Sequence, residues 1–111
     1  MRRFFFYFYG MNIKQYLDST YLKTASQAGL SEKENDLIVQ GFIKEAIEEG
    51  FKLIMIRPDK VKMAKEMIVK AQSKLLIGTV ISFPEGINSL DEKLAEAQKA
   101  IEDGADELDY V

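Results

Sequence analysis

The chain has 111 residues, a length typical of one domain or part of one, and 47% of them are hydrophobic, enough for a packed core. Its net charge of −3 argues against general nucleic-acid binding, which normally needs a basic surface. The sequence contains neither Cys nor His. Disulfides, zinc–thiolate sites and histidine acid–base chemistry are therefore excluded, so any proton transfer must use Asp, Glu, Lys or Tyr.

The first ten residues, MRRFFFYFYG, differ in composition from the rest of the chain. Their apolar run is too short for a signal peptide or a membrane span. Because Met11 follows directly, we interpret residues 1–10 as an extraneous aromatic leader and residues 11–111 as the domain. A membrane-touching anchor is the alternative. The run has high β-propensity and no proline, which favours non-native strand pairing.

From Met11 onward, strand-like and helix-like segments alternate. Residues 16–22 predict a short strand that ends in polar residues. Residues 31–50 predict a helix that opens with a capping box of Ser31 and Glu34. The apolar run 52–56 does not alternate with polar residues, which predicts a strand buried on both faces.

The second half of the chain repeats this pattern. Pro58 predicts the first position of a helix over residues 58–72, where its missing N–H costs nothing. Residues 75–83 predict a third buried strand. A second capping box begins a helix over residues 89–104, and residues 107–111 predict a fourth strand.

Helical spacing also predicts which side chains of these helices are buried. The third long helix has an apolar stripe whose predicted buried members are Leu90, Leu94, Ala97 and Ile101. The second is rich in lysine, which predicts a solvated face formed by Lys60, Lys62, Lys65 and Lys70.

A β-α-β-α-β-α-β order with short connections implies an α/β fold with a parallel sheet and right-handed crossovers. Two architectures fit this order: an open doubly wound sheet, or part of a (β/α)8 barrel. A complete barrel takes about 250 residues. The chain would then supply about four βα units, a little under half of the ring.

Chemistry in parallel α/β folds collects at the carboxyl ends of the strands. We expect Asp18 and Thr20, Arg57, Ser82 and Asp109 at these ends. Asp109 lies in an otherwise apolar strand, so it is either a hydrogen-bonded or water-facing structural residue or a carboxylate in a barrel mouth. Asp18 is equally consistent with a turn residue that bonds its own backbone. The sequence has no phosphate-binding glycine loop and no metal-ligand constellation.

Four segments taken in order resemble the deoxyribose-phosphate aldolases. These are LDSTYLK (17–23), IMIRP (54–58), TVISFPEG (79–86) and EKLAEAQKAIEDGADELDYV (92–111). The resemblance covers residues 11–111, and the last two motifs together are quite specific. Two departures stand out: Met55 replaces a common Cys, and Ser82 replaces a common Gly.

This resemblance implies the N-terminal portion of a TIM-barrel class I aldolase. Such enzymes reversibly cleave 2-deoxy-D-ribose 5-phosphate to glyceraldehyde 3-phosphate and acetaldehyde, in cytoplasmic deoxyribonucleotide catabolism. They use a lysine Schiff base and need neither a metal nor a cofactor. By its place in the motif Asp109 matches the acid/base aspartate, and Asp18 and Thr20 match a substrate-binding segment. The implied partner is a phosphosugar, with homo-oligomers possible and no nucleic-acid or membrane partner.

The same resemblance places the Schiff-base lysine on strands beyond residue 111. Lys52 and Lys74 are predicted at the opposite ends of their strands, and nothing in the pattern desolvates Lys23. We therefore expect this chain to be truncated and inactive alone.

Two other interpretations stay open. One is a non-catalytic half-barrel that assembles with itself or with a second chain, which would cover its unpaired strand edges. The other is a small open-sheet binding domain of flavodoxin-like strand order. A strand order of 1-2-3-4, instead of 2-1-3-4, would exclude the latter.

Overall fold

The structure is a computed structural model that describes residues 7–8, 11–12 and 18–110, with side chains from residue 18 onward. Two short strands, β1 (Tyr7–Phe8) and β2 (Met11–Asn12), pair in antiparallel fashion. Most of the predicted leader, and the start of the first predicted strand, lie outside the described residues. The division of the chain at residue 10 therefore stays a prediction.

A four-stranded parallel sheet forms the centre of the fold, and its strand order is β3-β4-β5-β6. The strands are β3 (Asp18–Tyr21), β4 (Leu53–Ile56), β5 (Leu76–Ile81) and β6 (Glu107–Tyr110). Each strand thus pairs with its neighbours in the chain. The alternative with flavodoxin-like strand order is excluded, and the expected α/β fold is confirmed.

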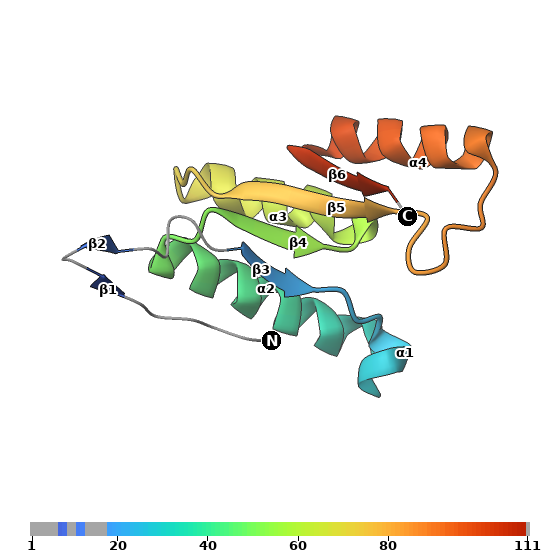
Figure 1. The fold of residues 1–111 in the computed structure, drawn as a ribbon. Helices are drawn as coiled ribbons and strands as arrows, with labels where there is room; N and C mark the ends of the chain where they lie inside the picture. Colours follow the sequence, from blue (N-terminus) through green and yellow to red (C-terminus); the bar gives the residue numbers. More distant parts are fainter. Residues whose placement is uncertain (1–6, 9–10, 13–17, 111) are drawn as a thin grey trace.

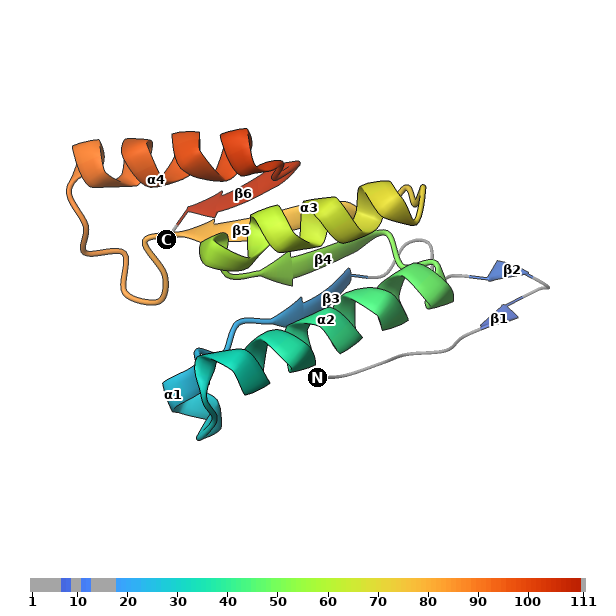
Figure 2. The same cartoon turned by 180° about the vertical axis from the view of Figure 1, so that it is seen from behind.

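Three long helices lie on one side of this sheet, as Figures 1 and 2 show from opposite directions. They are α2 (Glu32–Glu49), α3 (Val61–Lys70) and α4 (Leu90–Asp103). This arrangement follows from the strand order, because successive right-handed crossovers between adjacent parallel strands place every helix on the same side. The other face of the sheet carries no helix in the described part of the chain.

The helix boundaries follow the predicted caps closely. Ser31 Oγ accepts from Glu34 N at 3.2 Å, and Glu34 Oε1 accepts from Ser31 N at 3.1 Å. Ser89 and Glu92 form the same reciprocal pair. The backbone and side-chain hydrogen bonds from Ser31 lower the pKa of Glu34 below its usual value. Both predicted capping boxes are confirmed.

Two helical details differ from the prediction. Pro58 starts a short 3-10 helix, η2 (Pro58–Lys60), and α3 follows it and ends at Lys70 instead of residue 72. A four-residue helix, α1 (Ala25–Ala28), was not predicted; its capping box uses Thr24 and Gln27. One turn is too short for a detectable helical period.

The main core lies between the sheet and helices α2 and α3. Ile54, Ile56 and Ile77 project from the strands and are fully buried. They meet apolar residues of the two helices, among them Val39, Ile43, Phe42, Ala46, Val61, Ala64 and Ile68. Alternate strand residues therefore point to the helix layer, which leaves the intervening residues on the opposite face.

The predicted buried face of α4 is largely wrong. Ala97 is buried, together with Ala100, but Leu90, Leu94 and Ile101 are 70%, 52% and 58% exposed. The two alanines pack against Ile81 in a small second cluster. Since α4 is the last helix of the layer, its large apolar side chains lie on a flank that no described element covers.

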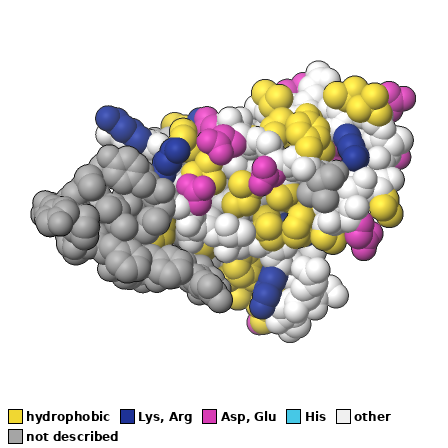
Figure 3. Space-filling view, viewed as in Figure 1, with side chains coloured by type: hydrophobic (Ala, Val, Ile, Leu, Met, Phe, Trp, Pro, Cys, Tyr) yellow, Lys and Arg dark blue, Asp and Glu magenta, His cyan; other side chains and the backbone are white. Residues whose placement is uncertain are grey.

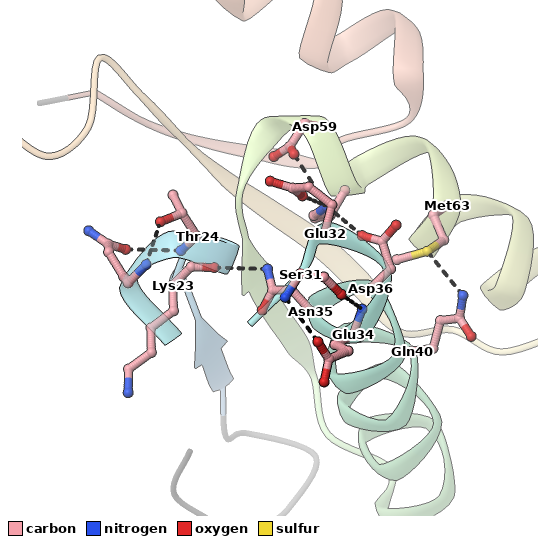
Figure 4. Close-up of polar contacts among 12 residues, drawn as sticks. Lys23, Thr24, Ser31, Glu32, Glu34, Asn35, Asp36, Gln40, Asp59 and Met63 are labelled. Carbon is pink, nitrogen blue, oxygen red and sulfur yellow. Dashed lines mark hydrogen bonds and ion pairs between the residues drawn. The ribbon is translucent and has the colours of Figure 1, made fainter. Parts of the chain in front are cut away.

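The prediction of a solvated lysine face is wrong for Lys60. Its side chain is only 11% exposed and forms ion pairs with Asp36, with Asp59 at 3.4 Å and with Glu32 at 3.6 Å. Figure 4 shows these three carboxylates converging between α2 and the start of α3. The cluster joins the two helices just beyond the carboxyl end of β4.

Candidate functional site

The face of the sheet opposite the helices carries the predicted site residues. The strand register places Thr20 beside Met55 and Val80 beside Asp109. Residues paired in register share a face, and so do residues two apart in one strand, so Asp18 lies on this face with Thr20. Figure 3 looks onto this face, where hydrophobic side chains gather with acidic ones among them.

A concavity of about 500 Å³ brings all three predicted site residues together. Asp18, Thr20 and Asp109 line it with Leu22, Met55, Val80, Phe83 and Tyr110. Asp18 and Thr20 come from β3 and Asp109 from β6, the two outer strands of the four-stranded sheet. The sequence analysis expected these residues at strand ends, and in the structure all three line one cavity.

The settings of two of these residues bear on the alternatives that the sequence left open. Asp109 is exposed in β6, so it is not a buried residue of its strand. Asp18 is the first residue of β3, not a residue at the carboxyl end, although its side chain still reaches the cavity. Within residues 18–110 neither carboxylate forms a hydrogen bond or an ion pair with another residue of that range. Both are therefore available to a ligand or a water molecule.

Asp106 fixes the strand that carries Asp109. Its backbone N–H donates to the Ile77 carbonyl at 2.7 Å, and its Oδ2 accepts from the Ile77 N–H at 2.9 Å. This two-point contact sets the register of β6 against β5 and so places Asp109 beside Val80. Sequence analysis gave no role to Asp106; its position just before a predicted strand was the available signal.

The turn after β5 shapes one rim of the cavity. Ser82 is 4% exposed, and its Oγ donates to Asn88 Oδ1 at 2.6 Å and accepts from Asn88 N at 3.2 Å. Its φ of 59° lies in the left-handed region, which suits the glycine that many relatives were expected to have here. The peptide bond between Phe83 and Pro84 is cis. The two hydrogen bonds between Ser82 and Asn88 stabilise the turn that carries Phe83.

Arg57 connects two parts of the cavity wall. Its Nη1 donates to the Leu22 carbonyl at 3.1 Å, and its guanidinium carbon lies 5.7 Å from the centroid of the Phe83 ring. Leu22 and Phe83 both line the cavity. The sequence predicted Arg57 at a strand end without a role, and the structure shows that it joins the segments that follow β3 and β5.

The chemistry available in this cavity is that of carboxylates. Asp18 and Asp109 can accept and return protons, and Thr20 can donate a hydrogen bond. None of the eight lining residues in the described part of the chain is a lysine, so these eight side chains offer no amine for covalent catalysis. Residues 18–110 hold no cluster of side chains suited to a metal ion, and no helix in the described ranges is long and apolar enough to cross a membrane.

Comparisons with known proteins agree on one family. No protein-family model matches the sequence. The chain is 39% identical over 102 residues to the deoxyribose-phosphate aldolase of Thermococcus gammatolerans, and 37% identical over 99 residues to that of Thermococcus kodakarensis. These matches cover 92% and 89% of this chain, but only 42% and 41% of the relatives.

Comparison of the fold with solved structures points to the same family. The structure of the deoxyribose-phosphate aldolase from Aeropyrum pernix, described as a tetramer, matches with a TM-score of 0.71 at 30% identity. An aldolase designated QR15 matches with a TM-score of 0.71 at 34% identity. Each match covers 88% of this chain and under two-fifths of the other. By sequence and by fold, the chain is therefore a relative of the deoxyribose-phosphate aldolases that spans about two-fifths of their length.

Proposed function

We propose that this chain supplies the carboxylate part of a deoxyribose-phosphate aldolase site, with Asp109 as the acid/base residue. The observation that carries the proposal is the convergence of Asp18, Thr20 and Asp109 on one cavity. The substrate would be 2-deoxy-D-ribose 5-phosphate, and the place of action the cytoplasm. Both expectations derive from the family resemblance.

The geometry fits the proton transfers that such a reaction needs. In a Schiff-base aldolase, an amine condenses with the substrate aldehyde and becomes the electron sink for carbon–carbon cleavage. A hydroxyl proton must leave as that bond breaks, and the enamine carbon must gain a proton afterwards. An exposed carboxylate such as Asp109 can carry out both transfers through a water molecule. Asp18 and Thr20 would hold the sugar hydroxyls.

The amine would come from outside this cavity lining. A lysine must lose hydration or gain a cationic neighbour before it is nucleophilic near neutral pH. Of the lysines in the described part of the chain, Lys60 is the most buried, and its pKa is raised. Its burial alone would lower the pKa, but the hydrogen bond to Asp36 and the charges of Asp59 and Asp36 outweigh that effect. Lys60 is therefore a poor nucleophile.

A chimera tests the role of Asp109. Residues 11–111 would replace the matching segment of the Thermococcus gammatolerans aldolase, and aldol cleavage would be measured. We expect Asp109→Asn to lower kcat at least about 100-fold, the usual scale of a lost acid/base group. Glu107→Gln is the matched control, because Glu107 is exposed on the same face of the same strand, and it should leave kcat unchanged. An active chimera that tolerates Asp109→Asn would refute the assignment.

The chain alone tests the origin of the amine. With acetaldehyde and borohydride, an amine at the site would be trapped as a stable secondary amine. We expect no such adduct on residues 1–111, since the eight lining residues that the structure describes include no lysine. A single labelled lysine, identified by mass spectrometry, would show that this chain has its own nucleophile.

A further inference from the structure

One row of paired residues crosses the face of the sheet that lies opposite the helices. The strand register places Thr20 beside Met55 and Met55 beside Gly78. Thr20 and Met55 line the cavity described above, whereas Gly78 does not. The next pair on this face, Val80 and Asp109, also lines it. Met55 therefore lies in β4, between the strand that carries Thr20 and the strand that carries Val80.

Gly78 makes room for the side chain of Met55. A Cβ atom at position 78 would lie 2.8 Å from Met55 Cε, 3.3 Å from Met55 Sδ and 3.2 Å from Leu53 Cδ2. Carbon atoms in contact are normally about 3.5–4.0 Å apart, so the thioether occupies the space of the missing side chain. Gly78 lies inside β5 and has no positive φ, so the backbone itself does not require glycine. Glycine inside a strand often marks a close approach, and here the group that approaches is Met55.

This packing directs the end of Met55 away from Thr20. Neighbouring strands lie about 4.8 Å apart, and the Met55 methyl group lies over β5, on the side opposite β3. Methionine is unbranched and has three rotatable bonds, so its end can turn toward either neighbouring strand. A side chain at position 78 would block the turn toward β5 and leave only the cavity and the side of Thr20. Gly78 therefore keeps the thioether from filling the cavity.

We propose that Met55 and Gly78 together determine which aldehydes the cavity admits. Met55 is the specificity-determining residue, and Gly78 is a positioning residue that acts through it. The inference rests on the proposed function, because it requires the substrate to occupy this cavity. With Met55 packed on Gly78, the space beside Thr20 stays open to a small straight-chain aldehyde. Removal of the thioether opens the cavity to longer aldehydes, whereas a side chain at position 78 pushes the thioether into the cavity and hinders substrate binding.

The chimera that carries residues 11–111 tests this pair in the synthetic direction, with acetaldehyde or propanal added to glyceraldehyde 3-phosphate. We expect Met55→Ala to raise kcat/KM for propanal relative to acetaldehyde at least about tenfold, the low end of what one methylene group is worth in an apolar pocket. Gly78→Ala should lower kcat/KM for acetaldehyde at least about tenfold. Its KM should rise more than its kcat falls, because the displaced thioether obstructs binding of the substrate and leaves the carboxylates in place.

The double variant identifies Met55 as the group through which Gly78 acts. Met55→Ala leaves no thioether to displace, so the addition of Gly78→Ala to it should change kcat/KM by less than about twofold. If Gly78→Ala acted by weakening the strand, it would lower kcat/KM in both backgrounds. Gly41→Ala is the matched control, since Gly41 is exposed on α2 and a Cβ there meets nothing within 4 Å outside the neighbouring backbone. It should leave kcat/KM and the aldehyde preference unchanged.

Nuclear magnetic resonance of the full chain, with labelled methionine methyl groups, tests the packing without any activity. We expect cross-peaks between the Met55 methyl group and the α-protons of Gly78, and a displaced Met55 methyl resonance in Gly78→Ala. Absence of these cross-peaks would overturn the inference. An active, Asp109-dependent chimera whose aldehyde preference is unchanged by Met55→Ala, or whose kcat/KM is unchanged by Gly78→Ala, would overturn the inference alone. A chimera that tolerates Asp109→Asn would refute the proposed function, and the inference with it.

Discussion

Replacing Lys60 with methionine tests the ion-pair cluster that joins α2 to α3. Methionine keeps most of the apolar stem, so the change removes mainly the charge. Three carboxylates then face one another without a cation. The side chain of Lys60 is 11% exposed and that of Asp36 is 41% exposed. The pair therefore lies between a surface ion pair, worth about 0.2–1 kcal/mol, and a buried one, whose disruption costs about 3–5 kcal/mol.

We expect Lys60→Met to lower the free energy of unfolding by about 1–2 kcal/mol, measured by urea titration at fixed chain concentration. For a domain of this size, that is a fall in Tm of roughly 4–8 °C. A double-mutant cycle with Asp36→Asn isolates the pair, and its coupling energy should be about 1 kcal/mol. If Lys60→Met matches the parent in stability, the cluster is an ordinary surface contact and the reasoning fails.

The pH dependence gives a second, independent check. The folded state raises the pKa of Lys60, because the contacts with Asp36 and Asp59 outweigh the opposing effect of burial. A raised pKa stabilises the folded state fully below the unfolded value, about 10.4 for lysine, and this contribution is lost as pH rises through the folded pKa. The stability difference between parent and Lys60→Met should therefore be constant near neutral pH and shrink above about pH 10.4. A difference that stays constant in strong alkali would refute the assignment.

Three further substitutions probe contacts that position the sheet and the cavity. Thr79→Val removes a buried hydroxyl that donates to the Ile56 carbonyl at 2.8 Å, and should cost about 1 kcal/mol in urea unfolding; an unchanged midpoint would show that the carbonyl finds another donor. Gly104→Ala forces a side chain onto φ 113° and should cost at least about 1 kcal/mol, with a lower Tm as the readout. Arg57→Met removes the donor to the Leu22 carbonyl and should cost about 1 kcal/mol and alter the near-ultraviolet circular dichroism; an unaltered spectrum would argue against the link.

Local chemistry in the sequence determined the secondary structure and much of the topology. Ser31 and Ser89 cap their helices through the predicted residues, since a capping box needs only four consecutive positions. The unbroken apolar runs predicted β4 and β5, because a strand that is covered on both faces does not need to alternate apolar with polar residues. Short connections between alternating elements then favoured a parallel sheet. Functional residues of parallel α/β folds lie near the ends of the strands, and this rule identified Asp18, Thr20 and Asp109 as candidates.

Only the tertiary structure decided which neighbour each side chain meets. The spacing of Leu94 and Ile101 showed an apolar stripe, but a stripe is exposed when its helix is the last of a layer. Lys60 looked solvated because two of its carboxylate partners, Glu32 and Asp36, lie on another helix. Asp109 is exposed because its side chain lies on the face of the sheet that no described helix covers. The periodicity of a sequence predicts which residues share one face of a helix or strand. Burial and charge pairing depend on contacts between elements, and these contacts exist only in the folded chain.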